Sequence, residues 1–396
     1  MKFFKRRLKN GITVIHEKRE LPLVSLSITN PFGAKHEISD IKGVAHFIEH
    51  LLFTGTKTRT NEQIAREIEK KGGLLNAFTS ESVTSYWFKL PSEHIFAGLN
   101  ILIDMMKNPA FNEEKFEKEK KVILEEIKRY HDMPQVHIYD KILENLYEKP
   151  FGEGVIGTKH TVSQLKRDFV ANYYSKHYSP ENYIVTMVGN ADFEKVCEYL
   201  ENNFKPENKI LPKANIKKIN KESVEERHGI DQAHFIFAIH APLATDNKIY
   251  ALEILDAYLA NGMSSKLFLE IREKRGLAYA VTSMFDSKKD YSYYTIYVGT
   301  MKEAIPEVKK LILEGFNSIS NMTEKDLEEE KTRLVGLKEV ISEESINVMN
   351  ELMLSELADK AENYYEYEKN IGQVTLEQVK ELAKIKSYST AAIVPK

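Results

Sequence analysis

Hydrophobic and polar positions alternate at the start of the chain, which is the pattern of β-strands. The runs KFFKRRL and TVIHEK are joined by residues 9–11 (KNG), a sequence typical of a hairpin turn, and the run VSLSIT follows. The pattern then changes to a helical period over residues 43–54 and 60–71, and Thr60 with Gln63 has capping-box spacing at the second helix. Strands that precede a block of helices predict an α+β arrangement.

These two patterns continue to about residue 205. Two more strand-like runs, LLNAFTS and TSYWFKL, follow directly on each other, and a third, NYIVTMVG, comes after a series of helical patterns. Those helices are expected near residues 92–107, 112–130, 135–148 and 162–174. The stretch that follows, KPENKILPKANIKKINKE, is rich in lysine, asparagine and proline and has no sustained period, which indicates a linker.

After the linker the order of elements repeats. HFIFAIHAP parallels VSLSITNPF, KIYALEILDAYLA parallels KGVAHFIEHLLF, and NMTEKDLEEEKTRLVGLKEV parallels FNEEKFEKEKKVILEEIKRY. We therefore predict an α+β protein made of two homologous α/β-sandwich domains, each an antiparallel-type sheet packed against helices, that arose by tandem duplication. The expected division is residues 1–205 for the N-terminal domain, 206–222 for the linker and 223–396 for the C-terminal domain.

The two copies differ at polar positions in two of their helices. The first carries His46, Glu49 and His50 within five positions, whereas the second has no histidine pair there and has Leu337 where the first has Glu126. Residues at i, i+3 and i+4 share one helical face, so these three side chains should point the same way. Two imidazoles one turn apart can hold a zinc ion, and a carboxylate beside them can take a proton from water. The pattern H-x-x-E-H is a known zinc-peptidase motif.

The surroundings of this triplet favour a metal site over a chance grouping of polar residues on one helix. Apolar residues occupy nearly every side of the helix: Val44, Ala45, Phe47, Ile48, Leu51, Leu52 and Phe53. The helix should therefore be buried, and burying three ionisable groups without a partner costs several kcal/mol. A bound metal ion removes that cost.

A catalytic zinc ion usually has three protein ligands, and the helix FEKEKKVILEEIKRY offers carboxylates for the third. Helical spacing predicts an inward stripe of four residues: Glu119, Val122, Ile123 and Glu126. Glu125, Lys118 and Lys121 fall on the solvated side. Glu126 is thus the favoured third ligand, with Glu119 on the same face. The alternative is an ordinary surface charge run.

Composition and charge narrow the class further. The chain has 396 residues, 42% hydrophobic and 29% charged, which is typical of a globular protein with two domains. A net charge of -3 gives no reason to expect nucleic acid or an anionic membrane as a partner, and no apolar run is long enough to span a bilayer. The single cysteine, Cys197, lies in an amphipathic helical pattern and is expected to be a buried structural thiol. Together with the lack of a signal-peptide pattern, this favours a cytoplasmic location.

The motifs resemble those of the pitrilysin, insulysin and mitochondrial processing peptidase family. HFIEH resembles the family's inverted zinc motif, in which a glutamate about 75 residues further on is the third ligand. Here 126 minus 50 is 76. The resemblance implies the metal ligands His46, His50 and Glu126 and the general base Glu49. Glu119, seven residues before Glu126, matches a further family carboxylate that supports the catalytic site.

Two more segments match the family. LLNAFTSESVTSYW resembles a segment whose strand pairs with substrate, which implies four substrate-binding residues: Asn76, Ala77, Phe78 and Thr79. Without the family, this is a hairpin strand with a core phenylalanine. SSKLFLEIREKRGLAYAV resembles the family's arginine–tyrosine segment, which implies that Arg272 and Tyr279 hold substrate and stabilise the oxyanion. Without the family, a helix that ends at Gly276 and a solvated Arg272 explain this stretch.

The resemblance implies a zinc-dependent endopeptidase that hydrolyses unstructured peptides or oligopeptides in a clamshell chamber, with one Zn²⁺ per chain. Half-size members of the family work in pairs. Because this chain carries both motifs, we expect a homodimer in which Arg272 and Tyr279 face the zinc of the other subunit. A heterodimer with a related subunit is the alternative assembly. The alternative functions are a zinc-free structural or assembly subunit and a peptide-binding module.

Overall fold

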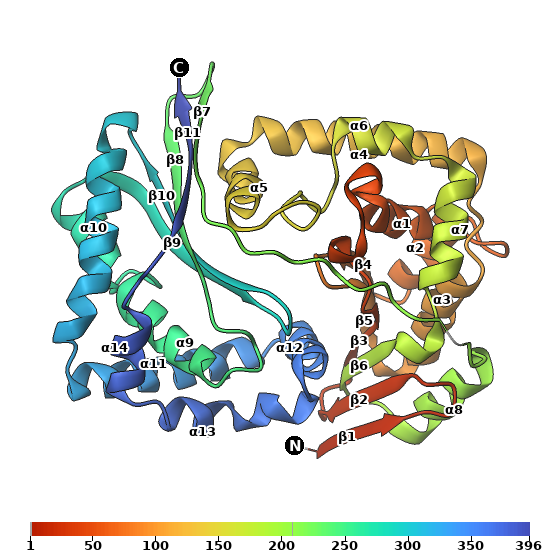
Figure 1. The fold of residues 1–396 in the computed structure, drawn as a ribbon. Coiled ribbons are helices and arrows are strands. Elements are labelled where there is room, and N and C mark those ends of the chain that lie inside the picture. The colour runs from red at the N-terminus through yellow and green to blue at the C-terminus, as the bar shows by residue number, and fades with distance from the viewer. Residues whose placement is uncertain (1, 208) are drawn as a thin grey trace. The chain divides into compact units, whose positions relative to one another are not determined.

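The computed structural model describes residues 2–207 and 209–396, which form two compact units, each with its own β-sheet (Figure 1). The first unit comprises the chain up to Lys128, Glu153–Asn215 and Ser342–Glu356. The second comprises Arg129–Gly152, Ile216–Ile341 and Leu357–Lys396. Each unit therefore contains a segment from the sequence half that forms most of the other.

The sheet of the first unit has six strands in the order β1-β2-β6-β3-β5-β4. The strands are β1 (Lys2–Arg7), β2 (Thr13–Lys18), β3 (Leu23–Asn30), β4 (Leu74–Thr79), β5 (Thr84–Pro91) and β6 (Ile184–Gly189). β2 and β6 are parallel, and the other neighbours are antiparallel. The predicted β1–β2 hairpin is confirmed, and Gly11 in its turn has a φ of 90°, which glycine adopts without strain.

Helices cover one face of this sheet. Those that contribute to the core are α1 (Val44–Phe53), α2 (Asn61–Glu69), α3 (Ile95–Lys107), α4 (Glu113–Asp132), α6 (Lys159–Gln164), α7 (Arg167–His177) and α8 (Phe193–Asn203). β3 supplies Val24, Leu26 and Ile28 to this core and turns Ser25, with its alternate neighbours, to the opposite face. There the Ser25 hydroxyl lies 2.8 Å from that of Ser345 in α12 (Ser345–Ala358), most of which belongs to this unit.

The second sheet repeats the first strand by strand. Its order is β7-β11-β8-β10-β9, and its strands are β7 (Glu222–Arg227), β8 (Ala233–His240), β9 (Ala278–Ser287), β10 (Ser292–Thr300) and β11 (Ser389–Pro395). This order matches β2-β6-β3-β5-β4, and β7 is parallel to β11 just as β2 is parallel to β6. The predicted α+β fold with two related sheets is thus confirmed, and β1 is an addition to the first sheet.

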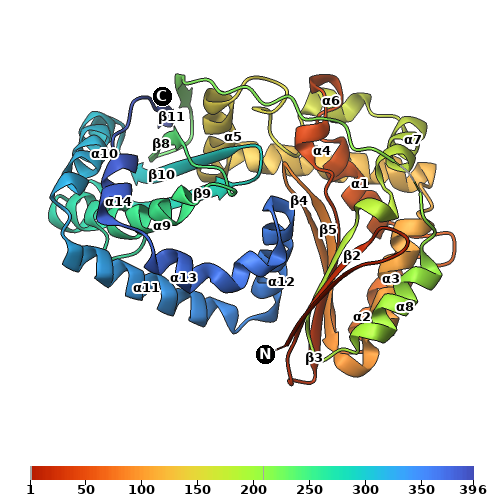
Figure 2. The same cartoon turned by 60° about the horizontal axis from the view of Figure 1, so that its bottom comes forward.

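Both faces of the second sheet are also covered. β8 directs Phe235 and Phe237 to a core that helices complete, and directs Ile236 to the other face. The core helices are α9 (Lys248–Leu259), α10 (Ile305–Ser318), α11 (Glu324–Ser342), α13 (Tyr367–Gly372) and α14 (Leu376–Leu382) (Figure 2). On the other face, α5 (Pro134–Leu146) packs its Ile138 and Ile142 against the sheet. α5 comes from the N-terminal half of the sequence but belongs to the second unit. α12 comes from the C-terminal half, and most of it belongs to the first unit, so the two helices are counterparts.

Most of the predicted helices and strands lie where the sequence placed them, with one correction among the helices. The expected helix near residues 162–174 is two helices, α6 and α7, because Leu165 and Lys166 between them have extended backbone with ψ of 135° and 144°. Between Phe204 and Lys221 the described residues form no helix or strand apart from an isolated bridge at Lys218, and β7 begins at Glu222. The domain division at residues 206–222 stays a prediction.

Two expectations from composition concern a thiol and a membrane span. Cys197 is buried in α8, as predicted, and burial raises the pKa of its thiol to about 11, which makes it a poor nucleophile at neutral pH. Among the helices that the structure describes, none has the length and apolar character needed to cross a membrane.

Candidate metal centre

The helix α1 is buried, as its apolar composition predicts, and a carboxylate holds its N-terminus. Glu37 accepts hydrogen bonds from the backbone N–H groups of Gly43 at 3.0 Å and Ala45 at 2.6 Å, which have no partner within the helix. Burial raises the pKa of Glu37 to about 7, although the nearby Lys42 opposes the shift. This contact fixes the first turn of α1, directly before His46.

Three donor atoms converge between α1 and α4. The Nε2 atoms of His46 and His50 lie 3.8 Å and 3.5 Å from Oε2 of Glu126. One ligand atom from each residue lies within 4.8 Å of the others. Ligand atoms arranged tetrahedrally around zinc are roughly 3.4 Å apart, so small side-chain movements would bring all three onto one ion.

The charges at this cluster suit a cation. Burial, together with the neighbouring His50, lowers the pKa of His46 to about 4, so its imidazole is neutral and able to ligate. Burial also disfavours the charged form of His50, but hydrogen bonds to Glu119 and Glu126 prevail and raise its pKa to about 9. A proton on His50 thus supplies the positive charge that the carboxylates require, and a metal ion can replace that proton.

Two more carboxylates surround the cluster. Thr79 Oγ1 of β4 donates a 2.5 Å hydrogen bond to Glu49 Oε2, which holds this carboxylate beside the histidines. Burial raises the pKa of Glu49, whereas Thr79 and His50 oppose the shift. Glu119 Oε2 lies 3.4 Å from His50 Nδ1, the ring nitrogen that faces away from Glu126, and can therefore set the tautomer of His50.

A pocket of about 540 Å³ opens beside these residues within the first unit. Its lining consists of Glu49, His50, Phe53, Thr54, Asn61, Leu75, Asn76, Lys115, Lys118 and Glu119. β4 borders the pocket and pairs only with β5, so its second backbone edge has no strand partner within the sheet. Ala77 packs partly against the core, whereas Phe78 is half-buried and lies outside that core.

The predicted inward face of α4 needs one correction. Glu119, Ile123 and Glu126 point inward as expected, and Glu125 is exposed. Val122, however, is 45% exposed, so the prediction that it faces inward was wrong. The buried face of α4 is centred on Phe116 and Ile123, and Val122, about 100° before Ile123 around the helix axis, falls outside it.

The two predicted residues of the arginine–tyrosine segment lie in the second unit. Arg272 belongs to a π-helical segment, Phe268–Lys274, and its guanidinium lies 4.8 Å from the ring centre of Phe268. The segment ends before Gly276, whose φ is 61°, as the sequence indicated. Arg272 is exposed in this unit.

Tyr279 is held by its neighbours in the second sheet. Its hydroxyl lies 3.1 Å from that of Tyr297 in β10, which in turn lies 2.8 Å from Nδ1 of His234 in β8. The Tyr279 ring lies directly over Gly299 of β10, where a Cβ atom would come within 2.2 Å of it. Tyr279 as a whole is 43% exposed, so it remains accessible to a ligand.

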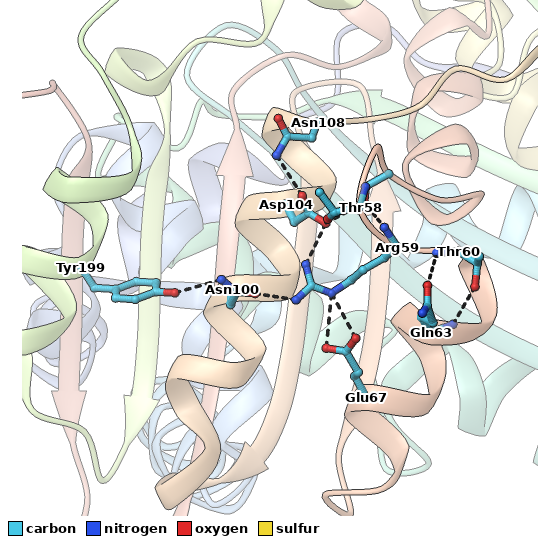
Figure 3. A network of polar contacts seen from close by, with 10 residues as sticks. Thr58, Arg59, Thr60, Gln63, Glu67, Asn100, Asp104, Asn108 and Tyr199 are labelled. Atoms are coloured by element: carbon cyan, nitrogen blue, oxygen red, sulfur yellow. Dashed lines mark hydrogen bonds and ion pairs between the residues drawn. The ribbon is translucent and has the colours of Figure 1, made fainter.

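Sequence reasoning missed the network that fixes the loop after α1 (Figure 3). Asp104 of α3 accepts hydrogen bonds from the Thr56 hydroxyl at 2.6 Å, the Thr58 hydroxyl at 2.7 Å and Arg59 Nη1 at 2.8 Å. Arg59 Nε also pairs with Glu67 at 3.2 Å. The sequence does contain one sign of this network, because Asp104 is an acidic residue within the apolar run ILIDMMK. A carboxylate buried in such a run requires hydrogen-bond or charged partners.

Helix α1 carries the H-x-x-E-H pattern, which is a motif of zinc peptidases. Residues 13–159 match the family model described as insulinase (peptidase family M16), and residues 164–334 match that of the peptidase M16 inactive domain. The chain belongs to peptidase family M16.

The proteins with similar sequences align with this chain over most of its length and most of their own. An uncharacterized zinc protease of Bacillus subtilis, YmxG, is 31% identical over 405 residues, which cover 98% of this chain and 97% of that protein. An uncharacterized zinc protease of Rickettsia felis is 34% identical over 83% of this chain and 80% of that protein. Their names support a metallopeptidase. A protease from Helicobacter pylori shares the fold, with a TM-score of 0.93 at 22% identity over 100% of this chain and 99% of that one.

Proposed function

We propose that this chain is a zinc-dependent endopeptidase that hydrolyses peptide bonds in unstructured peptides. The observation that carries the proposal is the convergence of His46, His50 and Glu126 beside Glu49, next to the edge strand β4. Neutral imidazoles and carboxylates are the ligands that catalytic zinc uses in proteins. The zinc-protease names of the relatives support the same class.

The three ligand residues would hold one zinc ion per chain and leave one coordination position open. When bound, the zinc ion polarises the scissile carbonyl group and lowers the pKa of water in the site. Glu119 would keep His50 in the tautomer that ligates through Nε2, since it lies beside the Nδ1 atom.

Glu49 would act as the general base and then as the general acid. Its carboxylate accepts the proton of the attacking water and later delivers it to the leaving amine. The hydrogen bond from Thr79 keeps one carboxylate oxygen fixed, which leaves the other free for the proton. A fixed proton acceptor lowers the reorganisation that the reaction requires.

The edge strand β4 would bind the substrate by strand addition. A peptide in extended conformation can pair with the open backbone edge formed by Asn76, Ala77, Phe78 and Thr79. A folded protein offers few free extended segments, so the preferred substrates are unstructured peptides small enough for an enclosed chamber. Thr79 would then link substrate binding to Glu49, because it belongs to the binding strand and contacts the base.

The arginine–tyrosine segment would complete the site from a second subunit. Arg272 would hold the substrate, and the Tyr279 hydroxyl would donate a hydrogen bond to the oxyanion. Because one chain carries both the zinc motif and this segment, a homodimer would contain two complete sites.

Glu49→Gln tests the proposed base directly. The variant should bind as much zinc as the wild type and lose peptide hydrolysis, because an amide cannot accept the proton. Glu125→Gln, on the exposed side of α4, is the matched control and should keep full activity. Substantial turnover by Glu49→Gln would refute the base. A zinc-free wild-type protein would favour the structural or peptide-binding alternatives.

A further inference from the structure

A second group of histidine and glutamate side chains lies in the second unit, at the turn between α4 and α5. His131 is in the last turn of α4, His137 is in the first turns of α5, and Glu225 is on β7. One ligand atom from each lies within 4.8 Å of the others. His137 Nε2 is 3.9 Å from Glu225 Oε2, and the ring centres of the two histidines are 5.0 Å apart.

The backbone brings the two histidines together through a short turn. Met133 is the one residue between α4 and α5. Its N–H donates to the carbonyl of Tyr130, and its own carbonyl accepts the N–H of His137 at 2.9 Å. Pro134 occupies the first position of α5, where its fixed φ suits a helix start. The separation of His131 and His137 is therefore set by a well-bonded turn.

Neighbouring side chains orient two of the three donors. Asp140, one turn after His137, places its Oδ2 at 3.6 Å from the Nδ1 of that ring, and the Nε2 atom lies on the side of Glu225. Arg227 Nε donates to Glu225 Oε1 at 2.6 Å, which leaves Oε2 directed at His137. Arg227 also donates to the backbone carbonyl of His131.

The charges around the cluster are mixed, and the cationic ones can be accommodated. Lys141 Nζ lies 3.9 Å from Glu225 Oε2, but it lies closer, at 3.3 Å, to the exposed Glu144 and can stay there when a cation binds. Arg227 contacts the other oxygen of Glu225. The carboxylates of Asp140 and of Asp132, 3.6 Å from His131 Nδ1, add negative charge around the two rings.

We propose that His131, His137 and Glu225 form a second binding site for a divalent transition-metal ion, separate from the H-x-x-E-H site. Two imidazoles and one carboxylate favour zinc, nickel, cobalt or copper over calcium or magnesium. The side chain of His131 is 58% exposed, so water would complete the coordination and the ion would exchange with solvent. The bound ion would tie the α4–α5 turn to β7, one of the two edge strands of the second sheet.

The first test is zinc stoichiometry on the untagged full-length protein after removal of metal with a chelator. Titration with Zn²⁺ should give two equivalents for the wild type and one for His137→Ala. The first site is disabled independently by His46→Ala, which should also bind one equivalent, and the double variant should bind none. His160→Ala, an exposed histidine of α6, is the matched control and should bind two.

The second test measures stability in the His46→Ala background, where only the second site can respond. Zinc should raise the melting temperature of His46→Ala and leave that of His46→Ala/His137→Ala unchanged. Glu225→Gln keeps a hydrogen-bond acceptor for Arg227 and should weaken zinc binding at least tenfold, which separates ligation from folding. If His46→Ala binds no zinc, or if the double variant binds as much as His46→Ala, the second site does not exist.

Discussion

The hydrogen bond between Thr79 and Glu49 joins the two functions that the first unit would combine. Thr79 lies on β4, the strand proposed to bind peptide, and its hydroxyl holds the proposed base at 2.5 Å. A carboxylate without this partner would rotate about its last side-chain bond. It would then present its free oxygen to the substrate only part of the time.

We expect Thr79→Val to reduce kcat/KM by about 10- to 100-fold, since a hydrogen bond to a charged group contributes about 1.5–3 kcal/mol. Zinc content should not change, because Thr79 is not a proposed ligand. Thr79→Ser retains the hydroxyl and should keep most of the activity. If both variants lose kcat/KM equally, the cause is altered packing of β4 and not the loss of the hydrogen bond. Steady-state kinetics with a quenched fluorescent peptide would measure the difference.

Glu253 is a buried carboxyl group in α9 of the second unit. It accepts a 2.6 Å hydrogen bond from the Tyr367 hydroxyl, and burial raises its pKa to about 7 although Tyr367 and Lys338 oppose the shift. Burial lowers the pKa of Lys338 to about 8. The folded protein therefore binds a proton at Glu253 between about pH 4.5 and 7, where the unfolded chain has released it.

Because the folded state binds that extra proton, the contribution of Glu253 to stability falls as the pH rises from about 4.5 through about 7. Relative to wild type, Glu253→Gln should gain up to about 3 kcal/mol in unfolding free energy between pH 4.5 and 8. Urea unfolding of both proteins across this range would measure it. The exposed Glu377→Gln supplies the control, and a difference that does not vary with pH would contradict the shift.

At the level of single residues, the sequence predicted which side chains face the site when they lie on a helix with a recognisable pattern. Glu126 and Glu125 are neighbours, and helical spacing separated the one that faces the histidines from the one in solvent. Glu37, Asp104 and Glu225 could not be assigned, because their partners belong to other elements and no spacing rule connects them.

Among the elements, the pairing of β9 with β10 determines where Tyr279 can lie. The Tyr279 ring occupies the space over Gly299 of β10. Its hydroxyl lies 3.1 Å from the hydroxyl of Tyr297, which is also on β10, two residues before Gly299. A methyl group at position 299 would come within 2.2 Å of the ring, which real structures do not tolerate. The absence of a side chain at Gly299 is thus a requirement for this position of Tyr279.

Gly299→Ala should therefore displace Tyr279 and lower kcat/KM by about 10- to 100-fold, the loss typical of a small misplacement in a reacting site. Zinc content should remain that of the wild type, because Gly299 is not among the ligands proposed for either metal site. Gly336→Ala in α11, where nothing lies within 4 Å of a new Cβ, is the matched control. It should keep activity and gain about 1 kcal/mol of stability. Full activity of Gly299→Ala would contradict the proposed role of Tyr279 in the reaction.

Element types were predictable where periodicity was strong, as in α1, α4, the strands of the first sheet and β8 of the second. The break between α6 and α7 was not, because Leu165 and Lys166 carry no glycine or proline signal and the stop depends on packing. That α5 belongs to the second unit and most of α12 to the first could not be predicted either. An amphipathic pattern predicts that one face of a helix is buried, but it does not predict which sheet that face packs against.

For the molecule as a whole, the two units differ in the groups proposed for catalysis, since His46, His50 and Glu126 lie in the first unit and the arginine–tyrosine segment lies in the second. A homodimer in which each zinc faces the partner subunit makes a prediction about mixtures. Equal amounts of Glu49→Gln and Tyr279→Phe chains, each nearly inactive alone, should recover about a quarter of wild-type activity. Half of the dimers are then mixed, and each mixed dimer has one intact site.

Activity of the mixture is measured after subunits have exchanged, with sedimentation to verify the dimer. If the site were completed within one chain, every site in the mixture would still carry one of the two substitutions and no activity would return. A sedimentation profile that shows a fully active monomer would also exclude the dimer.

The exchange of α12 bears on the order in which the protein can fold as it is synthesised. The first sheet exists once β6 has been made at residue 189, but α12, which covers its Ser25 face, follows only at residues 345–358. The second sheet needs β11, residues 389–395, because that strand lies between β7 and β8. Neither unit can therefore finish folding on the ribosome before most of the chain has emerged, and the Ser25 face of the first sheet stays uncovered until α12 has been synthesised.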